Sequence, residues 1–405
     1  MPIRTFLKLV LLHGAIVIVA LVFVDFRSVE DLLSSANLVH WDAEHYQEIS
    51  QSGYKGFLVA FFPALPLVWK ALCLGPLGVS LLNAFVFFLS FFLIIREFKI
   101  RSGAEVMLYL SIPSFIFFFL PFTESIFFLS VTLMLIGLKR ENAVYVCLGL
   151  LLAVLARPAF TIVVPALILA EVVQDSWRPA LRNTLMYLLV AAIGVALVGY
   201  IQFLDTGVWF EFFTVQEGWG NELKLPAFPL TSWSDGIIVR LDAVAFLIGT
   251  LSGLFLLAYI MKSAIFKNTK LNKSQVFTFA YLGGITLVVL FYRGGSLFSL
   301  NRFIFATPFI IVAFHYWRRQ NITLKNIQLL QIFVLIFLFW LLFGSYVHIQ
   351  QLLVYAMLSV YVLLIFAVKS EVVLFRKYSL LLLTVLNLSF QVLLFLRFLS
   401  GQWVG

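Results

Sequence analysis

The stretch TFLKLVLLHGAIVIVALVFV, residues 5–24, decides the class of this protein. It is mostly apolar and about 20 residues long, which is the length that an α-helix needs to cross the hydrocarbon core of a bilayer. The run exceeds the apolar core of a secretory signal peptide, and no cleavage site of small residues follows it. We therefore interpret it as a retained membrane span, which predicts an integral membrane protein.

The composition extends this interpretation to the whole chain. Of the 405 residues, 62% are hydrophobic and 12% are charged, whereas charged residues make up about 25% of a soluble domain. The net charge is +9, but the Lys and Arg residues fall in short segments between apolar runs, where they orient membrane helices. We therefore expect membrane lipids as neighbours and no nucleic acid as a partner.

Apolar runs of roughly membrane length recur along the chain. Their number predicts an all-α integral membrane protein, a polytopic bundle of about thirteen membrane helices, folded as one domain over residues 1–405. The runs lie near residues 5–25, 76–95, 104–121, 123–138, 143–157, 158–173, 183–203, 241–261, 275–292, 302–317, 327–343, 348–368 and 379–397.

A further apolar run, residues 57–74, contains Pro63 and Pro66 and suits an interfacial or re-entrant helix better than a straight span. With this run outside the bilayer core, most of the 28 Lys and Arg fall on one side and most of the 19 acids on the other, as the positive-inside rule requires. The N-terminus is then cytoplasmic. Two long loops lie outside: residues 26–75, with short interfacial helices, and residues 204–240.

The polar residues of the outer side form a second pattern. Glu124 and Arg157 lie in tight hairpins between apolar runs, within the stretches PFTES and LARPAF. Ionisable groups in such places are costly and usually line a polar cavity, but a structural ion pair that pins the hairpins is an alternative. The candidate site residues on this side are Trp41, Asp42, Glu44, His45, Tyr46, Glu124, Arg157, Arg293 and Arg302.

Asp42 is the candidate catalytic residue of the first outer loop. If residues 41–52 are helical, Asp42, His45 and Tyr46 share one face of the helix. Glu44 would share a face with Asp42 only in an extended segment. Asp is also a favoured N-cap residue, so Asp42 is either a helix cap or a general base. A divalent metal held by Asp42, Glu44 and His45 is a further alternative.

This combination of groups indicates a reaction type. A carboxylate can take the proton from an attacking hydroxyl, and arginine suits a phosphate because it offers paired donors. A lipid-linked phosphate sugar would keep its tail in the bilayer and present its sugar to an outer cavity, with the phosphate as leaving group. We therefore expect glycosyl transfer from a polyprenyl-phosphate sugar donor to a glycan or glycolipid acceptor.

Five stretches carry a family resemblance: HWDAEHYQEISQSGY, AFFPALPLVWKAL, FFFLPFTESIFFLS, LARPAF and NRFIFATPF. Their order and rough spacing resemble those of the PIG-V-like mannosyltransferases, which include GPI mannosyltransferase 2 and belong to the GT-C class of membrane glycosyltransferases. The resemblance covers roughly residues 1–315. It implies a GT-C-type helical bundle, a polyprenyl-phosphate-mannose donor, an inverting mechanism and an acid of the first outer loop, here Asp42, as the catalytic residue.

The chain departs from the family in two respects. It has Arg157, Pro158 and Ala159 where a more polar tripeptide with Gly is expected in eukaryotic members, and it is shorter than those members. A GPI acceptor is therefore not expected. The compact loops indicate a multi-pass enzyme of a prokaryotic plasma membrane, with its active site on the outer face. No cofactor is expected, because most of the GT-C class works without a metal.

The working hypothesis gives each candidate residue a role. The donor phosphate would meet Arg302 or Arg157, with Arg293 as a further partner, while Asp42 deprotonates the acceptor hydroxyl. The remaining candidates are expected to bind the sugar or to orient the charged groups; these are Trp41, Glu44, His45, Tyr46 and Glu124.

Alternatives remain for the second loop and for the function. Residues 204–240 contain three Trp, so this loop either stacks on the acceptor or forms an interfacial aromatic belt. The protein could transfer another sugar, such as a pentose or glucose, or flip a lipid-linked sugar across the membrane. A flippase needs polar residues throughout the membrane depth, whereas here they concentrate on one side, which favours an enzyme.

Overall fold

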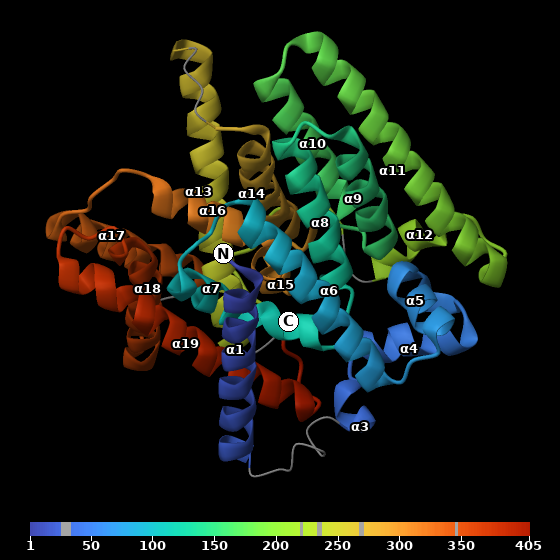
Figure 1. The fold of residues 1–405 in the computed structure, drawn as a ribbon, viewed down its shortest axis with the longest axis horizontal. Coiled ribbons are helices and arrows are strands. Elements are labelled where there is room, and N and C mark those ends of the chain that lie inside the picture. The colour runs from blue at the N-terminus through green and yellow to red at the C-terminus, as the bar shows by residue number, and fades with distance from the viewer. Residues whose placement is uncertain (26–33, 219–221, 233–236, 267–270, 345–346) are drawn as a thin grey trace.

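The described residues of the computed structural model are 1–25, 34–218, 222–232, 237–266, 271–344 and 347–405. Within them the chain is almost entirely helical, with two isolated β-bridges, so the predicted all-α class is confirmed. In Figure 1 the long helix α11 forms one flank, α17 to α19 form the other, and α6, α8 and α14 lie between them. The elements are α1 (Ile3–Asp25), α3 (Ser35–Leu38), α4 (Asp42–Ser52), η1 (Gly56–Ala60), α5 (Ala64–Leu72), α6 (Pro76–Glu97), α7 (Gly103–Leu110), η2 (Pro113–Phe119), α8 (Glu124–Lys139), α9 (Ala143–Ala156), α10 (Phe160–Gln174), α11 (Trp177–Thr206), α12 (Glu211–Gly218), α13 (Ile237–Phe266), α14 (Lys273–Tyr292), α15 (Leu300–Phe305), α16 (Pro308–Arg319), α17 (Asn326–Phe339), η3 (Trp340–Phe343), α18 (Ile349–Ala367) and α19 (Val373–Leu399).

Among the described residues, eight helices are long and apolar enough to cross a membrane, or nine if the bent pair η2 and α8 is one span. This length and composition confirm the predicted polytopic helical membrane protein. The predicted number of about thirteen spans is not confirmed, because several helices fall short of the roughly 20 residues that a span needs. α9 and α10, for example, have 14 and 15 residues.

Two of the predicted spans are divided at a proline. The sequence predicts one helix for each of the runs 104–121 and 302–317, but η2 begins at Pro113 and α16 begins at Pro308. Proline lacks the N–H that would continue the preceding helix, and it is well suited to the first turn of a new one. A separate bend of 105° lies between η2 and α8, at residues 120–123.

The run 57–74, predicted as an interfacial or re-entrant helix, forms η1 and α5 instead of a single long helix. The nine residues of α5 extend about 13 Å, less than half of a bilayer core. α5 buries Leu65 and Trp69 and exposes the apolar Leu67 and Leu72 beside the charged Lys70. Such a helix suits the membrane interface.

Phenylalanine rings and close glycine contacts build the core that holds the site. The ring of Phe87 in α6 stacks on Phe118 in η2 with centroids 4.2 Å apart. α13 and α14 cross at Gly253 and Gly283, where a Cβ on Gly283 would lie 2.6 Å from the Gly253 Cα. Small residues at a helix crossing allow the two backbones to approach closely.

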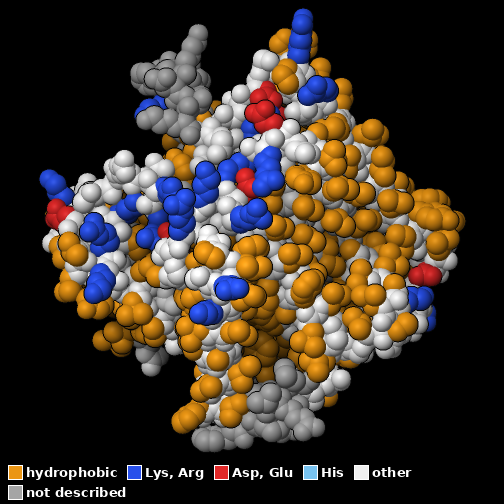
Figure 2. Space-filling view, in the orientation of Figure 1, with side chains coloured by type: hydrophobic (Ala, Val, Ile, Leu, Met, Phe, Trp, Pro, Cys, Tyr) orange, Lys and Arg blue, Asp and Glu red, His pale blue; other side chains and the backbone are white. Residues whose placement is uncertain are grey.

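Two sets of ion pairs stand out, one in each of the two groups of loops that the sequence predicts on opposite sides of the membrane. One cluster is the candidate site described below. The other includes the ion pairs Arg318–Glu105 at 2.5 Å and Lys273–Glu171 at 2.8 Å. Figure 2 shows Lys and Arg gathered across the region where Figure 1 labels α7 and α16, with a broad hydrophobic surface beside and below it.

Candidate active site formed by two carboxylates and two arginines

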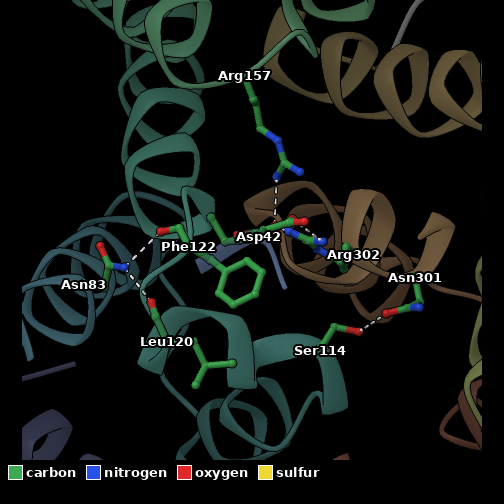
Figure 3. A network of polar contacts seen from close by, with 9 residues as sticks. Asp42, Asn83, Ser114, Leu120, Phe122, Arg157, Asn301 and Arg302 are labelled. Carbon is green, nitrogen blue, oxygen red and sulfur yellow. Dashed lines mark hydrogen bonds and ion pairs between the residues drawn. The ribbon is translucent and has the colours of Figure 1, made fainter. Parts of the chain in front are cut away.

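Arg302 is the centre of a buried network of charged side chains (Figure 3). It lies on the short helix α15, and its side chain is 5% exposed. Arg302 Nη1 donates to Asp42 Oδ2 at 2.9 Å, while Nε and Nη2 donate to Glu124 Oε1 at 3.0 and 2.7 Å. The guanidinium also lies 4.7 Å from the ring centroid of Phe117 and 5.0 Å from that of Phe122. These contacts join three distant segments of the chain.

Glu124 links the two arginines. Its carboxylate is fully buried at the beginning of α8, where the helix dipole favours a negative charge. Arg157 Nη1 lies 3.2 Å from Glu124 Oε1, the same oxygen that Arg302 contacts. The other oxygen, Oε2, is buried and accepts no hydrogen bond from any described residue. Arg157, next to the end of α9, also lies over the rings of Phe127 and Phe303.

Asp42 is the partly exposed end of this network. Its side chain is 23% exposed, whereas that of Glu124 is fully buried. The predicted alternative in which Asp42 caps its helix is not what the structure has. The N-cap position of α4 is Trp41, with a positive φ of 58° and no side-chain cap, and Asp42 is the first helical residue. Its carboxylate instead accepts from Arg302.

Tyr46 accompanies Asp42 on α4, as the predicted helical spacing requires. The Tyr46 side chain is buried, and its hydroxyl lies near Thr123, the residue before α8. Burial raises the pKa of the Tyr46 phenol well above its usual value, and the charge of Asp42 raises it further. The phenol therefore stays protonated and can donate a hydrogen bond beside the network.

His45 and Glu44 turn away from the network. The His45 ring packs against Phe57 and Phe61, with centroids 5.2 and 4.8 Å apart. The Glu44 side chain is 58% exposed, and its Oε1 lies 3.9 Å from His40 Nδ1. Across the part of the chain that the structure describes, no group of three or more His, Cys, Asp and Glu side chains could hold a metal ion, including in this loop.

The segment that follows α19 forms an aromatic wall of the network, and Figure 1 shows this end of the chain near the centre of the molecule. Trp41 Nε1 donates to the Gly401 carbonyl at 3.1 Å, and the rings of Trp41 and Trp403 meet edge to face at 5.3 Å. The Trp403 ring centroid lies 5.8 Å from the Arg302 guanidinium. Gly405 packs directly on this arginine, since a Cβ there would lie 2.3 Å from Arg302 Cδ.

Arg293 borders the network through aromatic rings. Its Nη1 donates to the Phe298 carbonyl, and its guanidinium lies 5.1 Å from the Phe298 ring centroid. That ring stacks on Trp403 at 5.1 Å. Burial lowers the pKa of Arg293 to about 10, and the charge of Asp242 opposes this shift. Arg293 therefore remains a cation at neutral pH. The stacked rings of Phe298 and Trp403 connect it to Arg302.

Asp242 and Asn301 support the network, and the sequence interpretation missed both. Asp242 Oδ1 accepts from the backbone N and from Nδ2 of Asn301, each at 2.8 Å, and Ser114 Oγ donates to Asn301 Oδ1 at 2.9 Å. Because Asn301 directly precedes Arg302, these bonds fix the start of the helix that carries the central arginine; Figure 3 shows the bond between Ser114 and Asn301. The sequence feature that could have revealed Asp242 is the presence of an acid in the otherwise apolar run 241–261.

Asn83 is a second residue that the sequence interpretation missed. Its Nδ2 donates to the backbone carbonyls of Leu120 at 2.6 Å and of Phe122 at 2.9 Å (Figure 3). These bonds tie α6 to the turn that leads into Glu124. The sequence feature that could have revealed it is a polar amide within the apolar run 76–95.

The second outer loop, residues 204–240, is described in part. Trp209 is half-exposed, and its ring stacks on Phe203 with centroids 4.9 Å apart. Trp219 and Trp233 lie outside the described residues. Both roles predicted for this loop, an acceptor platform and an interfacial belt, therefore stay predictions.

No family model, no curated protein and no solved structure matches this chain. Its function is therefore inferred from the chemistry of its own residues, above all the charged network around Arg302.

Proposed function

We propose that the protein is a PIG-V-like membrane glycosyltransferase of the GT-C class. It transfers mannose, with inversion, from a polyprenyl-phosphate donor to a hydroxyl of a glycan or lipid-linked acceptor, at the outer face of a prokaryotic plasma membrane. The observation that carries this proposal is the placement of Asp42. It is the partly exposed carboxylate of a network whose other members, Glu124, Arg157 and Arg302, are nearly or fully buried.

In the proposed reaction, the acceptor oxygen forms a bond to the anomeric carbon as the bond from that carbon to the phosphate oxygen breaks. The electron pair stays with the polyprenyl phosphate, and the acceptor proton passes to Asp42. Asp42 is suited to this role because Arg302 holds it through Oδ2. We assign its other oxygen, Oδ1, as the proton acceptor.

The two arginines would bind the donor phosphate. Both approach Glu124 Oε1, so this carboxylate holds two guanidinium groups side by side. A phosphate offers more acceptor oxygens than a carboxylate does and could take over part of these contacts. Tyr46, protonated and beside Asp42, would donate to a sugar hydroxyl or to the phosphate.

The same network would also suit a purely structural role, because it pins α4, α8 and α15 together. The two roles predict different results. A structural lock loses stability whenever a partner is removed, whereas a catalytic base loses rate with little change in stability. The partial exposure of Asp42 favours the catalytic role, since a lock gains nothing from contact with solvent.

The direct test is turnover of polyprenyl-phosphate-mannose in membrane vesicles that contain the protein and supply native acceptors. Release of free polyprenyl phosphate is measured for wild type, Asp42→Asn and the control Glu48→Gln, an exposed acid on the same helix. We expect Asp42→Asn to lose about 10²–10⁴-fold in rate and Glu48→Gln to match wild type. Equal rates for both variants would refute the role of Asp42.

A donor panel separates the remaining alternatives. Polyprenyl-phosphate glucose and pentose donors are offered in parallel with the mannose donor. Turnover of one of these alone would keep the reaction type and replace the sugar. Movement of the intact donor across the vesicle membrane without release of polyprenyl phosphate would identify a flippase and overturn the proposed enzyme.

A further inference from the structure

An apolar cavity of about 420 Å³ lies apart from the charged network. Its size is within the range of small-molecule sites, about 300–1,000 Å³. The walls come mainly from α7, α13, α16, α18 and α19, with Phe279 of α14 and Phe305 of α15, and they are almost wholly aliphatic and aromatic. Leu251 and Phe255 of α13 line it while about 40% of each side chain surface is exposed, so the cavity reaches the hydrophobic outer surface.

One end of this cavity meets a basic surface. Trp317 and Gln320, at the end of α16, and Phe366, at the end of α18, line that end. Arg319 directly precedes Gln320 in the sequence, and Lys369 Nζ donates to the Gln320 carbonyl. Figure 2 shows Lys and Arg side chains gathered over the region where Figure 1 labels α16, the helix that ends on this side of the cavity.

Two of these cations make their contacts to backbone oxygens. Arg319 Nη2 donates to the Lys99 carbonyl at 3.4 Å, and Lys369 Nζ donates to the carbonyls of Arg318 and Gln320. Arg318 differs, because its charge is balanced by Glu105 at 2.5 Å. In the described contacts, therefore, the positive charges of Arg319 and Lys369 at the cavity mouth face carbonyl dipoles and no carboxylate.

A buried polar group lies one helical turn from Glu105, which pairs with Arg318 beside the mouth. Tyr109 lines the cavity, and its side chain is 1% exposed. Its hydroxyl has no hydrogen-bond partner among the described residues. An unpaired buried hydroxyl is unfavourable, so a ligand that brings an acceptor oxygen to this depth would be favoured.

We propose that this cavity is a binding site for an anionic phospholipid, with one acyl chain in the cavity, an ester carbonyl at Tyr109 and the phosphate headgroup at Arg319 and Lys369. The apolar walls fit the chain, the cations fit a negative headgroup, and the hydroxyl fits the glycerol ester between them. A polyprenyl phosphate has no ester at that depth and fits less well. This site is separate from the charged network, so it does not depend on the proposed enzymatic function.

The test measures the thermal unfolding midpoint of delipidated protein in neutral detergent as a function of added lipid. The probes are phosphatidylglycerol, phosphatidylcholine with the same acyl chains, polyprenyl monophosphate and inorganic phosphate. A ligand that binds only the folded protein raises the midpoint with its concentration. We expect phosphatidylglycerol to stabilise the wild type at about tenfold lower concentration than phosphatidylcholine and inorganic phosphate to have no effect.

Matched variants locate the site. Arg319→Gln removes one exposed cation at the mouth, and Arg178→Gln makes the same change on α11, which does not line the cavity. We expect the first to weaken the phosphatidylglycerol effect about fivefold and the second to leave it unchanged. Ala313→Phe fills the cavity and should abolish the effect, whereas Ala196→Phe on the exposed face of α11 should not.

Three results would overturn the proposal: equal stabilisation by both phospholipids, an unchanged phosphatidylglycerol effect in Arg319→Gln, or tighter binding of polyprenyl monophosphate with the same sensitivity to Arg319→Gln. The last result would assign the cavity to a carrier lipid. If Ala313→Phe does not fold, the two arginine variants still decide the question.

Discussion

Arg302 shows why one residue type is required at the centre of the network. Its guanidinium donates to two carboxylates and lies among the rings of Phe117, Phe122 and Trp403. A planar fork of donors can contact two acids and still stack on aromatic faces, which the point charge of lysine cannot do. Burial makes these contacts strong, and it also makes each of them costly to break.

Glu124→Gln should therefore destabilise the protein. The change removes the charge that faces Arg157 and Arg302, and loss of a buried partner costs about 3–5 kcal/mol. We expect the thermal midpoint in detergent to fall by several degrees, while Glu48→Gln, on the exposed face of α4, leaves it unchanged. A Glu124→Gln midpoint equal to that of wild type would mean that the network contributes little to stability.

At this scale the sequence predicted the charged residues but not what holds them. Glu124, Arg157 and Arg302 were predictable because charges are rare in apolar hairpins, and the structure brings them together with Asp42. The residues that support the network were not predictable, because a residue such as Asn83 bonds to backbone carbonyls that only the fold brings near. Trp403 follows the last apolar run, where no periodic pattern marks it.

The first outer loop is the element that carries Asp42, and it is anchored at Gly53. The backbone N of Tyr54 donates to Asp205 Oδ2 on α11 at 2.9 Å. Gly53 ends α4 with φ of +76°, and a Cβ there would lie 2.7 Å from the same oxygen. Both the backbone angle and the close approach require glycine.

Gly53→Ala should detach this loop from α11. Backbone strain at a positive φ costs about 1–3 kcal/mol, and the clash with Asp205 adds to it. We expect faster tryptic cleavage after the exposed Lys55 than in wild type. Gly56→Ala is the control, because Gly56 also has a positive φ but has no atom within 4 Å of its Cβ position. Equal cleavage of both variants would exclude the Asp205 contact as the anchor.

Element boundaries were predictable where hydrophobicity decides them and less so where proline does. The runs 76–95 and 275–292 correspond closely to α6 and α14. The runs 104–121 and 302–317 are equally apolar, but Pro113 divides the first and Pro308 the second. Hydrophobic length alone therefore overestimates the number of spans, because it does not register the break in backbone hydrogen bonding.

At the scale of the whole molecule, the apolar surface and the two charged clusters define how the protein would sit in a membrane. Leu11 and Phe23 on α1 are among the most exposed large side chains, as expected for a surface that meets lipid. The proposed orientation places the Asp42 network on the outer side of the membrane. It places Arg319 and the neighbouring Lys and Arg residues on the cytoplasmic side. Several loops contribute to each cluster, so finding the side of the membrane on which one residue of a cluster lies also places the other loops of that cluster.

Labelling with a membrane-impermeant maleimide should show this orientation. Cys73 is exposed and Cys147 partly so, so both are first replaced by Ser. In that background Glu44→Cys, at a largely exposed position, should react in intact cells, and Arg319→Cys should react only after the membrane is permeabilised. The reverse pattern would invert the topology and move the proposed site to the cytoplasmic side.

The most direct test of the central claim measures rate and stability together for Asp42→Asn, in the same preparation as wild type. Arg302 keeps its two hydrogen bonds to Glu124 in this variant, so we predict a thermal midpoint close to that of wild type. Release of polyprenyl phosphate should fall by about 10²–10⁴-fold. A variant that turns over donor at the wild-type rate, or one whose lost activity follows entirely from a lowered midpoint, would contradict the assignment of Asp42 as the catalytic base.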